Sequence, residues 1–255
     1  MIFFLNDKYN YISNRMNSEV WQERSELLLG KDRLKKLAKS NVLVVGLGGV
    51  GAYASETICR AGVGRMTIAD GDIINPSNIN RQLPALNSTI GEEKAELMAG
   101  RLLDINPLLR LKVVNEFLAD NKLSELITSE KYDYVVDAID TLTPKIHLIQ
   151  TAVEHNIPVI SSMGAGGKLD PSQVRVCDIS HSYNCRLAYI LRKRLRKLGV
   201  NEGFNVVFSP EQVDPNSVML VEGEQNKKST VGTISYMPPL FGCYCASVVI
   251  RDLIS

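Results

Sequence analysis

Three glycines, Gly46, Gly48 and Gly51, stand at the spacing G-x-G-x-x-G in the stretch NVLVVGLGGVGAYASETICRAGVG, residues 41–64. A loop of this kind between a buried strand and a helix permits a tight turn and brings backbone amides close to a phosphate. Asp70 follows about 20 residues later, where an acidic side chain accepts a ribose hydroxyl. The pattern predicts a nucleotide site, and it fits a nicotinamide dinucleotide as well as ATP.

The next segment, DGDIINPSNINRQLPALNSTIGEEK, separates these two ligands. It places Asn78, Arg81 and Lys94 after Asp70. An arginine fork and a lysine point charge offset the charge that builds on the bridging oxygen when pyrophosphate leaves a triphosphate. Hydride transfer needs neither cation. The segment therefore favours ATP, and a nicotinamide oxidoreductase remains an alternative that preferential NAD(H) binding would support.

Alternating strands and helices must position these side chains. We expect strands at 42–45, 66–69, 111–114, 134–136 and 159–161, with helices at about 50–61, 91–104, 121–129 and 143–155 between them. This alternation predicts an α/β fold with a Rossmann-like, doubly wound, mostly parallel sheet. Ligands bind such sheets at the carboxyl ends of the strands.

The rhythm weakens after residue 171. We expect a strand at 174–177, a basic helix at about 185–198, a strand at 206–208, a long irregular loop at 209–230 and a last helix, which together form a C-terminal mixed-sheet extension. The apolar run 231–250 contains two prolines, so we interpret it as loop plus buried helix, with peripheral membrane association as the alternative. The predicted organisation is a helical arm at 1–40, an ATP-binding region at 41–170 and a substrate-contact region of the same domain at 171–255.

Composition restricts the partners and the compartment. With 255 residues and a net charge of +1, any nucleic-acid contact must come from a local basic patch. The five cysteines are an odd number in a chain without a secretory signal pattern, which predicts a cytoplasmic protein. The chain has no Cys-x-x-Cys pair, so we expect no structural zinc.

The glycine loop, Asp70, the run SNINRQ, Lys94 and the DAID that ends at Asp140 together resemble the adenylation domain of the ThiF/MoeB/HesA superfamily, which is related to ubiquitin-activating enzymes. The resemblance implies that the chain binds ATP and Mg²⁺ and forms an acyl adenylate on a carboxylate. It implies that the nucleotide is approached by Gly46, Gly48, Gly49 and Gly51, its ribose by Asp70, and its phosphates by Asn78, Arg81 and Lys94.

Two further roles follow from the same resemblance. Asp140 is implied to hold Mg²⁺ or to orient the substrate carboxylate, whereas we expect Asp137 to end its strand. The run WQERSELLLG resembles the family's N-terminal helix, whose arginine reaches the ATP site of a dimer partner. Arg24 is the matching residue, which implies a catalytic role for Arg24 and a homodimer.

The second half resembles the branch of tRNA threonylcarbamoyladenosine dehydratases, through SSMGAGGKLDP at 161–171 and NCRLAYILRKRLRKLG at 184–199. That branch implies cyclisation of a modified adenosine next to the tRNA anticodon, with Gly164, Gly166 and Gly167 near the substrate. Both reacting groups belong to one side chain, so no protein nucleophile is needed; a thioester on Cys177 or Cys185 is the alternative.

The basic helix supports an RNA partner. Leucine and isoleucine recur at helical spacing and are expected to face the core: Leu187, Ile190, Leu191, Leu195 and Leu198. The other faces carry only cations: Arg186, Arg192, Lys193, Arg194, Arg196 and Lys197. A solvated helix usually mixes charges, so this face favours nucleic-acid contact.

Two other functions remain open on sequence alone. The first is adenylation of a ubiquitin-like C-terminus or a sulfur carrier, with a cysteine-desulfurase system as sulfur-transfer partner. The second is a nucleotide- and RNA-binding module without turnover. Consumption of ATP would separate the second from the enzymes.

Overall fold

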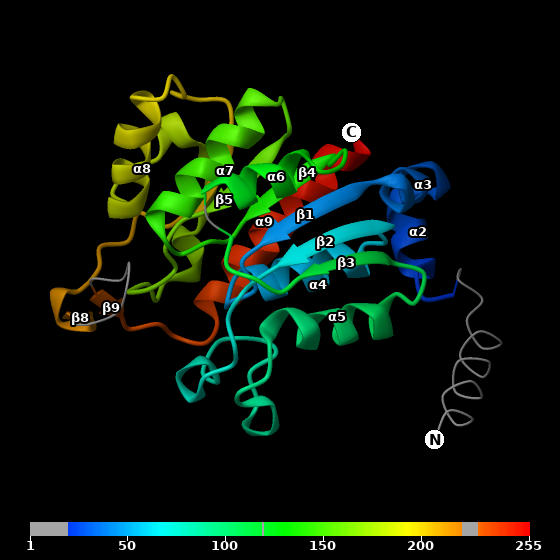
Figure 1. The fold of residues 1–255 in the computed structure, drawn as a ribbon, viewed down its shortest axis with the longest axis horizontal. Helices are drawn as coiled ribbons and strands as arrows, with labels where there is room; N and C mark the ends of the chain where they lie inside the picture. Colours follow the sequence, from blue (N-terminus) through cyan, green and yellow to red (C-terminus); the bar gives the residue numbers. More distant parts are fainter. Residues whose placement is uncertain (1–19, 119, 221–228) are drawn as a thin grey trace.

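A seven-stranded sheet forms the centre of the computed structural model, which describes residues 20–118, 120–220 and 229–255. Its strands lie in the order β3-β2-β1-β4-β5-β7-β6 (Figure 1). Their bounds are β1 Asn41–Val45, β2 Arg65–Ala69, β3 Arg110–Val114, β4 Tyr134–Asp137, β5 Val159–Ser162, β6 Arg175–Asp178 and β7 Asn205–Phe208. All neighbouring strands are parallel except β6 and β7. The predicted α/β fold, with its mixed C-terminal part, is confirmed.

Helices cover both faces of the sheet, which explains why residues 42–45 of β1 are all apolar. Val42 and Val44 belong to the core under α4, α5 and α9, and Leu43 and Val45 to the core under α6, α7 and α8. The helices are α4 Gly51–Arg60, α5 Lys94–Ile105, α6 Asp120–Thr128, α7 Leu142–Glu154, α8 Arg186–Arg196 and α9 Met237–Ile254. A strand buried on both faces shows no alternation of polar residues.

The strand order reverses at β1, since β2 and β3 lie on one side of it and β4 and β5 on the other. At such a switch point the loops after the strands diverge and leave a crevice at their carboxyl ends. The glycine loop follows β1 here, and the turn to α7 follows β4. The fold thus places the predicted nucleotide elements at one edge of the sheet.

Two helices lie at the amino ends of the strands, opposite the glycine loop. They are α2, Glu23–Leu29, and α3, Lys31–Lys39, which leads directly into the amino end of β1 (Figure 1). Leu37 of α3 is fully buried in the core that contains α4. The expected arm at 1–40 is described from residue 20 onward, and residues 1–19 lie outside the described residues.

The irregular loop expected at 209–230 is wrong in part. The segment contains a 3₁₀ turn at Pro215–Ser217 and a two-stranded antiparallel sheet of β8, Val218–Leu220, and β9, Ser229–Val231. Residues 221–228 lie outside the described residues. Strands of three residues are too short to show a periodic pattern in the sequence.

The last helix, α9, lies in the core, as the loop-plus-helix interpretation predicted. By length and composition this helix could cross a membrane. It packs instead against α4, so closely that a β-carbon on Gly242 would lie 2.4 Å from the carbonyl oxygen of Val50. Phe241 and Cys245 are fully buried there.

The basic helix α8 buries Leu191 and Leu195, as predicted, and leaves Leu187 and Ile190 half-buried. The prediction for Leu198 is wrong, because this side chain is 46% exposed. The helix ends at Arg196, so Leu198 no longer follows the helical period.

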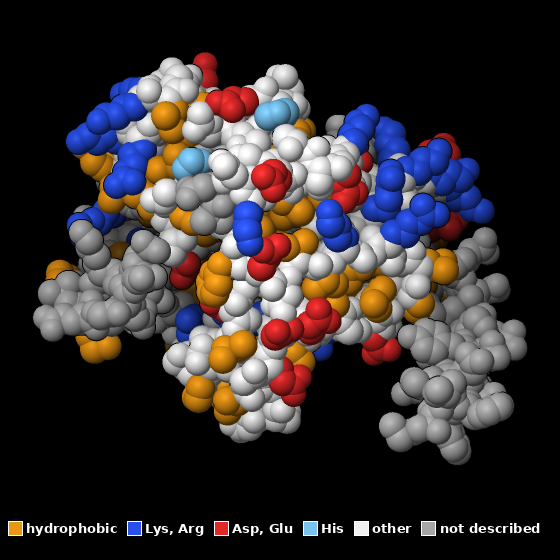
Figure 2. All heavy atoms as spheres, in the orientation of Figure 1, with side chains coloured by type: hydrophobic (Ala, Val, Ile, Leu, Met, Phe, Trp, Pro, Cys, Tyr) orange, Lys and Arg blue, Asp and Glu red, His pale blue; other side chains and the backbone are white. Residues whose placement is uncertain are grey.

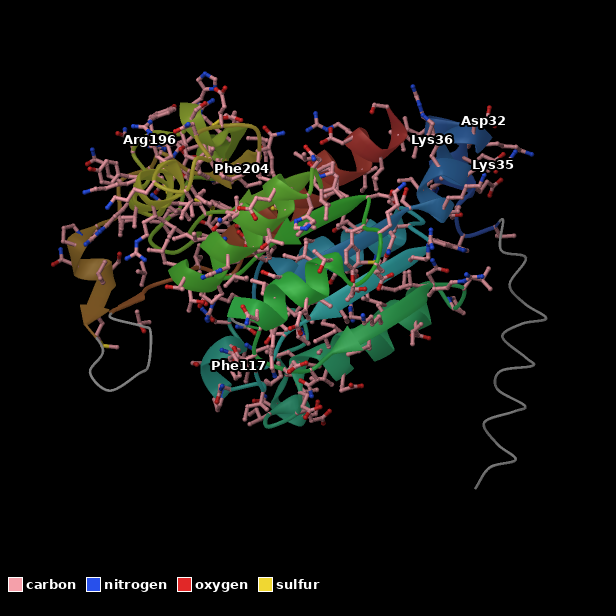
Figure 3. The ribbon with its side chains drawn as sticks, turned by 45° about the horizontal axis from the view of Figure 1, so that its top comes forward. Asp32, Lys35, Lys36, Phe117, Arg196 and Phe204 are labelled. Carbon is pink, nitrogen blue, oxygen red and sulfur yellow. The ribbon has the colours of Figure 1, made fainter. Side chains whose placement is uncertain are left out.

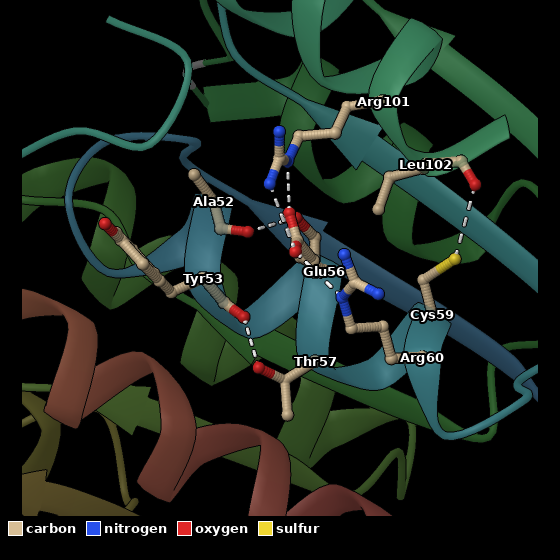
Figure 4. Close-up of polar contacts among 9 residues, drawn as sticks. Ala52, Tyr53, Glu56, Thr57, Cys59, Arg60, Arg101 and Leu102 are labelled. Carbon is tan, nitrogen blue, oxygen red and sulfur yellow. Dashed lines mark hydrogen bonds and ion pairs between the residues drawn. The ribbon is translucent and has the colours of Figure 1, made fainter. Parts of the chain in front are cut away.

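Ion pairs made by Glu56 join α4 to α5 (Figure 4). The Glu56 carboxylate accepts hydrogen bonds from Arg60 on its own helix, at 2.8 Å, and from Arg101 on α5. Burial alone would raise the pKa of Glu56, but the two arginines hold that pKa below the ordinary 4.5. The ion pairs therefore stabilise the fold above pH 4.5 and lose that effect as the pH falls through the lowered pKa.

Glu56→Gln is expected to lower the free energy of unfolding by about 0.5–1 kcal/mol at pH 7, because both arginines are about half exposed. Urea denaturation at pH 7, 5 and 4 measures this difference. The difference in the free energy of unfolding between variant and wild type should be smallest at pH 4. A gap that does not change with pH would show that packing, rather than charge, explains the loss.

Candidate functional site

The glycine loop is shaped by its own packing. Gly46 has φ +88°, and a β-carbon there would lie 2.7 Å from the Ala138 carbonyl oxygen. A β-carbon on Gly51 would lie 1.7 Å from the Gly46 carbonyl oxygen, and one on Gly49 2.9 Å from Pro238. These three glycines thus allow the loop to pack against the protein. A β-carbon on Gly48 would lie 3.7 Å from its nearest neighbour, the Gln82 side chain. This position therefore leaves room for a ligand to approach the backbone.

Asp70 lies beside this loop, just after β2. Its Oδ2 accepts the Leu47 amide at 2.6 Å, and its Oδ1 accepts the Asp72 amide at 2.8 Å. Burial raises the pKa of Asp70, although Lys94 and the two amides oppose this shift. Each carboxylate oxygen has a second lone pair, so Asp70 can still accept a ribose hydroxyl.

Lys94 begins α5 and is 4% exposed. Its Nζ lies 2.8 Å from Oδ2 of Asp72 and interacts electrostatically with Asp70. The sequence did not single out Asp72 as the ion-pair partner of Lys94. Phosphates that bind Lys94 must compete with this carboxylate.

The SNINRQ segment supplies one local anchor and one cation. Asn78 is buried, and its Oδ1 accepts the Asn75 amide at 3.0 Å, which holds the 3₁₀ turn Pro76–Asn78. Arg81 donates from Nη1 to the Ser77 carbonyl and to Asn80 Oδ1, both at 2.8 Å. The turn and these bonds fix where the Arg81 guanidinium lies.

Arg81 and Asp140 interact across the site. Burial lowers the pKa of Arg81, and the nearby Asp140 carboxylate opposes that shift. Asp140 is exposed in the turn after β4, two residues beyond the Ala138 carbonyl that packs on Gly46. A cation and a carboxylate thus face each other at the edge of the glycine loop.

Gln82 adds an acceptor that the sequence did not assign. It is 8% exposed, and its Oε1 is the buried side-chain oxygen that lacks a hydrogen-bond partner among the described residues. Its side-chain amide is also the nearest group to Gly48. A buried acceptor without a partner is costly, so this amide suits a site completed by a polar ligand such as ATP.

A fully buried ion pair lies below the Asp140 turn. Lys145 Nζ is 2.6 Å from Asp137 Oδ2, and both side chains are 0% exposed. Ser161 Oγ donates to the same oxygen at 2.6 Å, while Asp137 Oδ1 accepts the Ile139 amide at 3.1 Å. Asp137 ends β4 as expected, and the pair with Lys145 holds the turn that carries Asp140.

The expected substrate glycines lie next to the segment after β9. The Gly167 amide donates to the Gly232 carbonyl at 2.8 Å, and a β-carbon on Gly166 would contact Thr233. A β-carbon on Gly164 would have no atom of the described residues within 4 Å apart from its chain neighbours. Asn80 of the SNINRQ segment donates to the Thr233 carbonyl at 2.9 Å. Thr233 therefore links the two loops expected to contact nucleotide and substrate.

Arg24 is not brought to this site within one chain. It is exposed on α2, at the amino edge of the sheet, where the neighbouring Gln22 packs on Gly62. On the same helix Leu27 and Leu28 are 84% and 81% exposed. An action of Arg24 on the nucleotide therefore requires a second copy of the chain.

The described residues contain no group of three or more His, Cys, Asp or Glu side chains that could hold a metal ion. All five cysteines are free. Burial raises the pKa of Cys59 and of Cys245 to about 12 and also raises that of Cys177. Raised thiol pKa values disfavour the reactive thiolate.

The fold and this site define a class of nucleotide-binding proteins with a Rossmann-like sheet, and a comparison with protein families identifies the family. The ThiF family model matches residues 22–255, so the chain belongs to the ThiF family. It is 42% identical over 188 residues to a tRNA threonylcarbamoyladenosine dehydratase of Bacillus subtilis, which covers 74% of each chain. The dehydratase of the same name from Escherichia coli is 38% identical over 204 residues, 76% of each chain.

A solved structure extends the likeness to nearly the whole chain. The Escherichia coli tRNA N6-threonylcarbamoyladenosine dehydratase in complex with ATP superposes with a TM-score of 0.83 at 34% identity, over 94% of this chain and 97% of that one. The resemblance to the superfamily and to its dehydratase branch is confirmed.

Proposed function

We propose that this chain is an ATP-dependent dehydratase that cyclises threonylcarbamoyladenosine in tRNA. The observation that carries the proposal is that the glycine loop, Asp70, Arg81 and Asp140 lie together at the carboxyl ends of the strands. The dehydratase relatives, one of them with ATP bound, support it. The cation Arg81 at the glycine loop favours triphosphate chemistry over hydride transfer.

The reaction has two steps. The threonyl carboxylate attacks the α-phosphate of ATP and displaces pyrophosphate. A nitrogen or oxygen of the neighbouring ureido group then attacks the activated carbonyl, gives up its proton and expels AMP, so one water is lost overall. Because the carboxylate and the ureido group both belong to the side chain of the modified adenosine, the second step is intramolecular.

Each side chain has a role in this scheme. Asp70 accepts a hydrogen bond from a ribose hydroxyl, and Gly48 lets the phosphates reach backbone amides. Arg81 and Lys94 offset the charge that develops on the leaving pyrophosphate. Asn78 acts by holding the turn that carries Arg81. Asp140 would hold Mg²⁺ or orient the substrate carboxylate; Mg²⁺ bound there would neutralise phosphate charge.

The proposal extends to assembly and partners. Arg24 would act in a homodimer, from the α2 of the other copy. The exposed cations of α8 and the glycines at 164–167 would contact tRNA. Free cysteines and a tRNA substrate favour the cytoplasm.

AMP release from ATP tests the proposal. The protein is incubated with tRNA that carries threonylcarbamoyladenosine, with the same tRNA lacking that modification, or with a ubiquitin-like protein. We expect AMP only with the modified tRNA. Release with the protein substrate alone would favour protein activation, and no release with any of them would leave a binding module.

A further inference from the structure

One face of α8 carries a row of side chains that forms a shallow groove of about 470 Å³. The groove is lined by Tyr189, Arg192, Lys193, Arg196 and Lys197. These positions follow the i, i+3, i+4, i+7, i+8 pattern of a single helix face. Figure 2 shows the cations gathered over α8, and Figure 3 places Arg196 at the end of the molecule opposite Lys35 and Lys36 of α3.

The cations of this row have no acidic partner. Within 20–118, 120–220 and 229–255, no ion pair includes Lys193, Arg196 or Lys197. By contrast, the α3 lysines Lys31 and Lys35 pair with Glu26 and Asp32. The α8 row is thus the more available of the two for an anionic partner.

Tyr189 gives this row an aromatic surface. Its side chain is 59% exposed, and it lies at the amino-terminal end of the row. A lone exposed tyrosine is ordinary, but an aromatic ring beside unpaired cations is the arrangement that binds unpaired nucleotides, by stacking on a base and contacting its phosphate.

Arg192 differs from the other cations of the row because it donates hydrogen bonds to neutral groups of the protein. It is half-buried, and its Nη1 donates to the Ser182 carbonyl at 2.7 Å. This bond ties α8 to the turn Ile179–His181. Of the six cations expected to contact tRNA, Arg192 therefore has a partner within the protein.

The direction of α8 relative to the site is set by its first turn. The ring of Tyr183, three residues before α8, packs against Phe208 at the carboxyl end of β7, with ring centroids 5.6 Å apart. Val207, next to Phe208, accepts the Met163 amide just after β5 at 2.8 Å. Tyr189 is hence nearer than Lys197 to the glycines at the carboxyl end of β5. A rise of 1.5 Å per residue separates Tyr189, Lys193 and Lys197 by about 6 Å each, the same order as successive nucleotides in a strand.

We infer that Tyr189 stacks on an unpaired base of the tRNA loop that carries the modified adenosine, and that Lys193, Arg196 and Lys197 bind the phosphates leading away from it toward the stem. The inference rests on the proposed function. It assigns the loop to the Tyr189 end of α8 and the stem to the Lys197 end.

Equilibrium binding of tRNA to Tyr189→Ala and Tyr189→Phe tests the stacking. We expect the alanine variant to bind about five- to a hundredfold more weakly, and the phenylalanine variant to stay within about twofold of wild type. In turnover, KM for tRNA should rise in Tyr189→Ala while KM for ATP stays unchanged. Tyr244→Ala, an exposed tyrosine on α9, is the matched control and should change neither.

The salt dependence tests the cations. Lys193→Ala and Lys197→Ala should each reduce the slope of log K against log salt by about 0.7–1, whereas Tyr189→Ala should leave it unchanged. Wild-type binding by Tyr189→Ala, or equal losses in the alanine and phenylalanine variants, would overturn the stacking. Binding to anionic lipid vesicles that is lost in these variants while tRNA binding is retained would also overturn it.

These binding results are separable from the proposed function. If wild-type protein binds tRNA but releases no AMP, the dehydratase proposal fails while the Tyr189 measurements still decide the stacking.

Discussion

Arg81→Ala and Lys94→Ala are each expected to lower AMP formation by about 10²–10³-fold while the fold remains intact. Each change removes a cation that offsets charge developing on the leaving pyrophosphate, and the loss of one such preorganised group typically has this size. Arg81→Lys should lie between, because lysine keeps the charge but not the fork. The measurement is AMP formed per minute with modified tRNA, alongside circular dichroism.

Two controls separate catalysis from structure. Lys112→Ala removes a half-exposed cation on β3 that pairs with Glu130 at 3.8 Å, and it should not change turnover. Asp72→Asn removes the partner of Lys94 but keeps the lysine, so AMP formation should largely remain. Losses of equal size in Asp72→Asn and Lys94→Ala would mean that Lys94 acts by holding Asp72. Unchanged turnover in Arg81→Ala and Lys94→Ala would contradict adenylation at this site.

Lys145→Ala is expected to be the most destabilising substitution, by about 3–5 kcal/mol. It leaves the Asp137 carboxylate fully buried without its cation, 2.6 Å from where the ammonium was. Lys122→Ala breaks an exposed pair of similar length, 2.5 Å to Glu116, and should lower the free energy of unfolding far less. Urea denaturation gives both values.

A double variant tests whether the unpaired charge of Asp137 causes this loss of stability. Lys145→Met with Asp137→Asn removes both charges, and it should recover most of the lost stability because no charge is left buried. If the double variant is as unstable as Lys145→Ala, the charge of Asp137 does not explain the loss. The double variant also keeps the test possible should Lys145→Ala fail to fold.

Local patterns predicted the scaffold well. Val42 to Val45 form a continuous apolar run followed at once by the glycine loop, and such a run is a sequence-local signal for a buried parallel strand. The spacing from Gly51 to Asp70 likewise follows from one helix and one strand. The structure brings Asp70 to the glycine loop through the Leu47 amide.

The other features depend on contacts between segments far apart in sequence. The partner of Asp137 is Lys145 on the next helix, and Ser161 joins them from another strand. Nothing local marks Gln82 as buried beside Gly48, and Asn78 carries no sign that its side chain holds a turn. The prediction for Leu198 is wrong because the helix, and with it the helical period, ends at Arg196.

The most direct test of the central claim is mass spectrometry of nucleosides from tRNA that carries threonylcarbamoyladenosine, after incubation with this protein and Mg-ATP. We predict that this nucleoside loses one water, in proportion to the AMP formed, and that neither change occurs without ATP. AMP release with the nucleoside unchanged would contradict the dehydratase account and move the activity to another carboxylate.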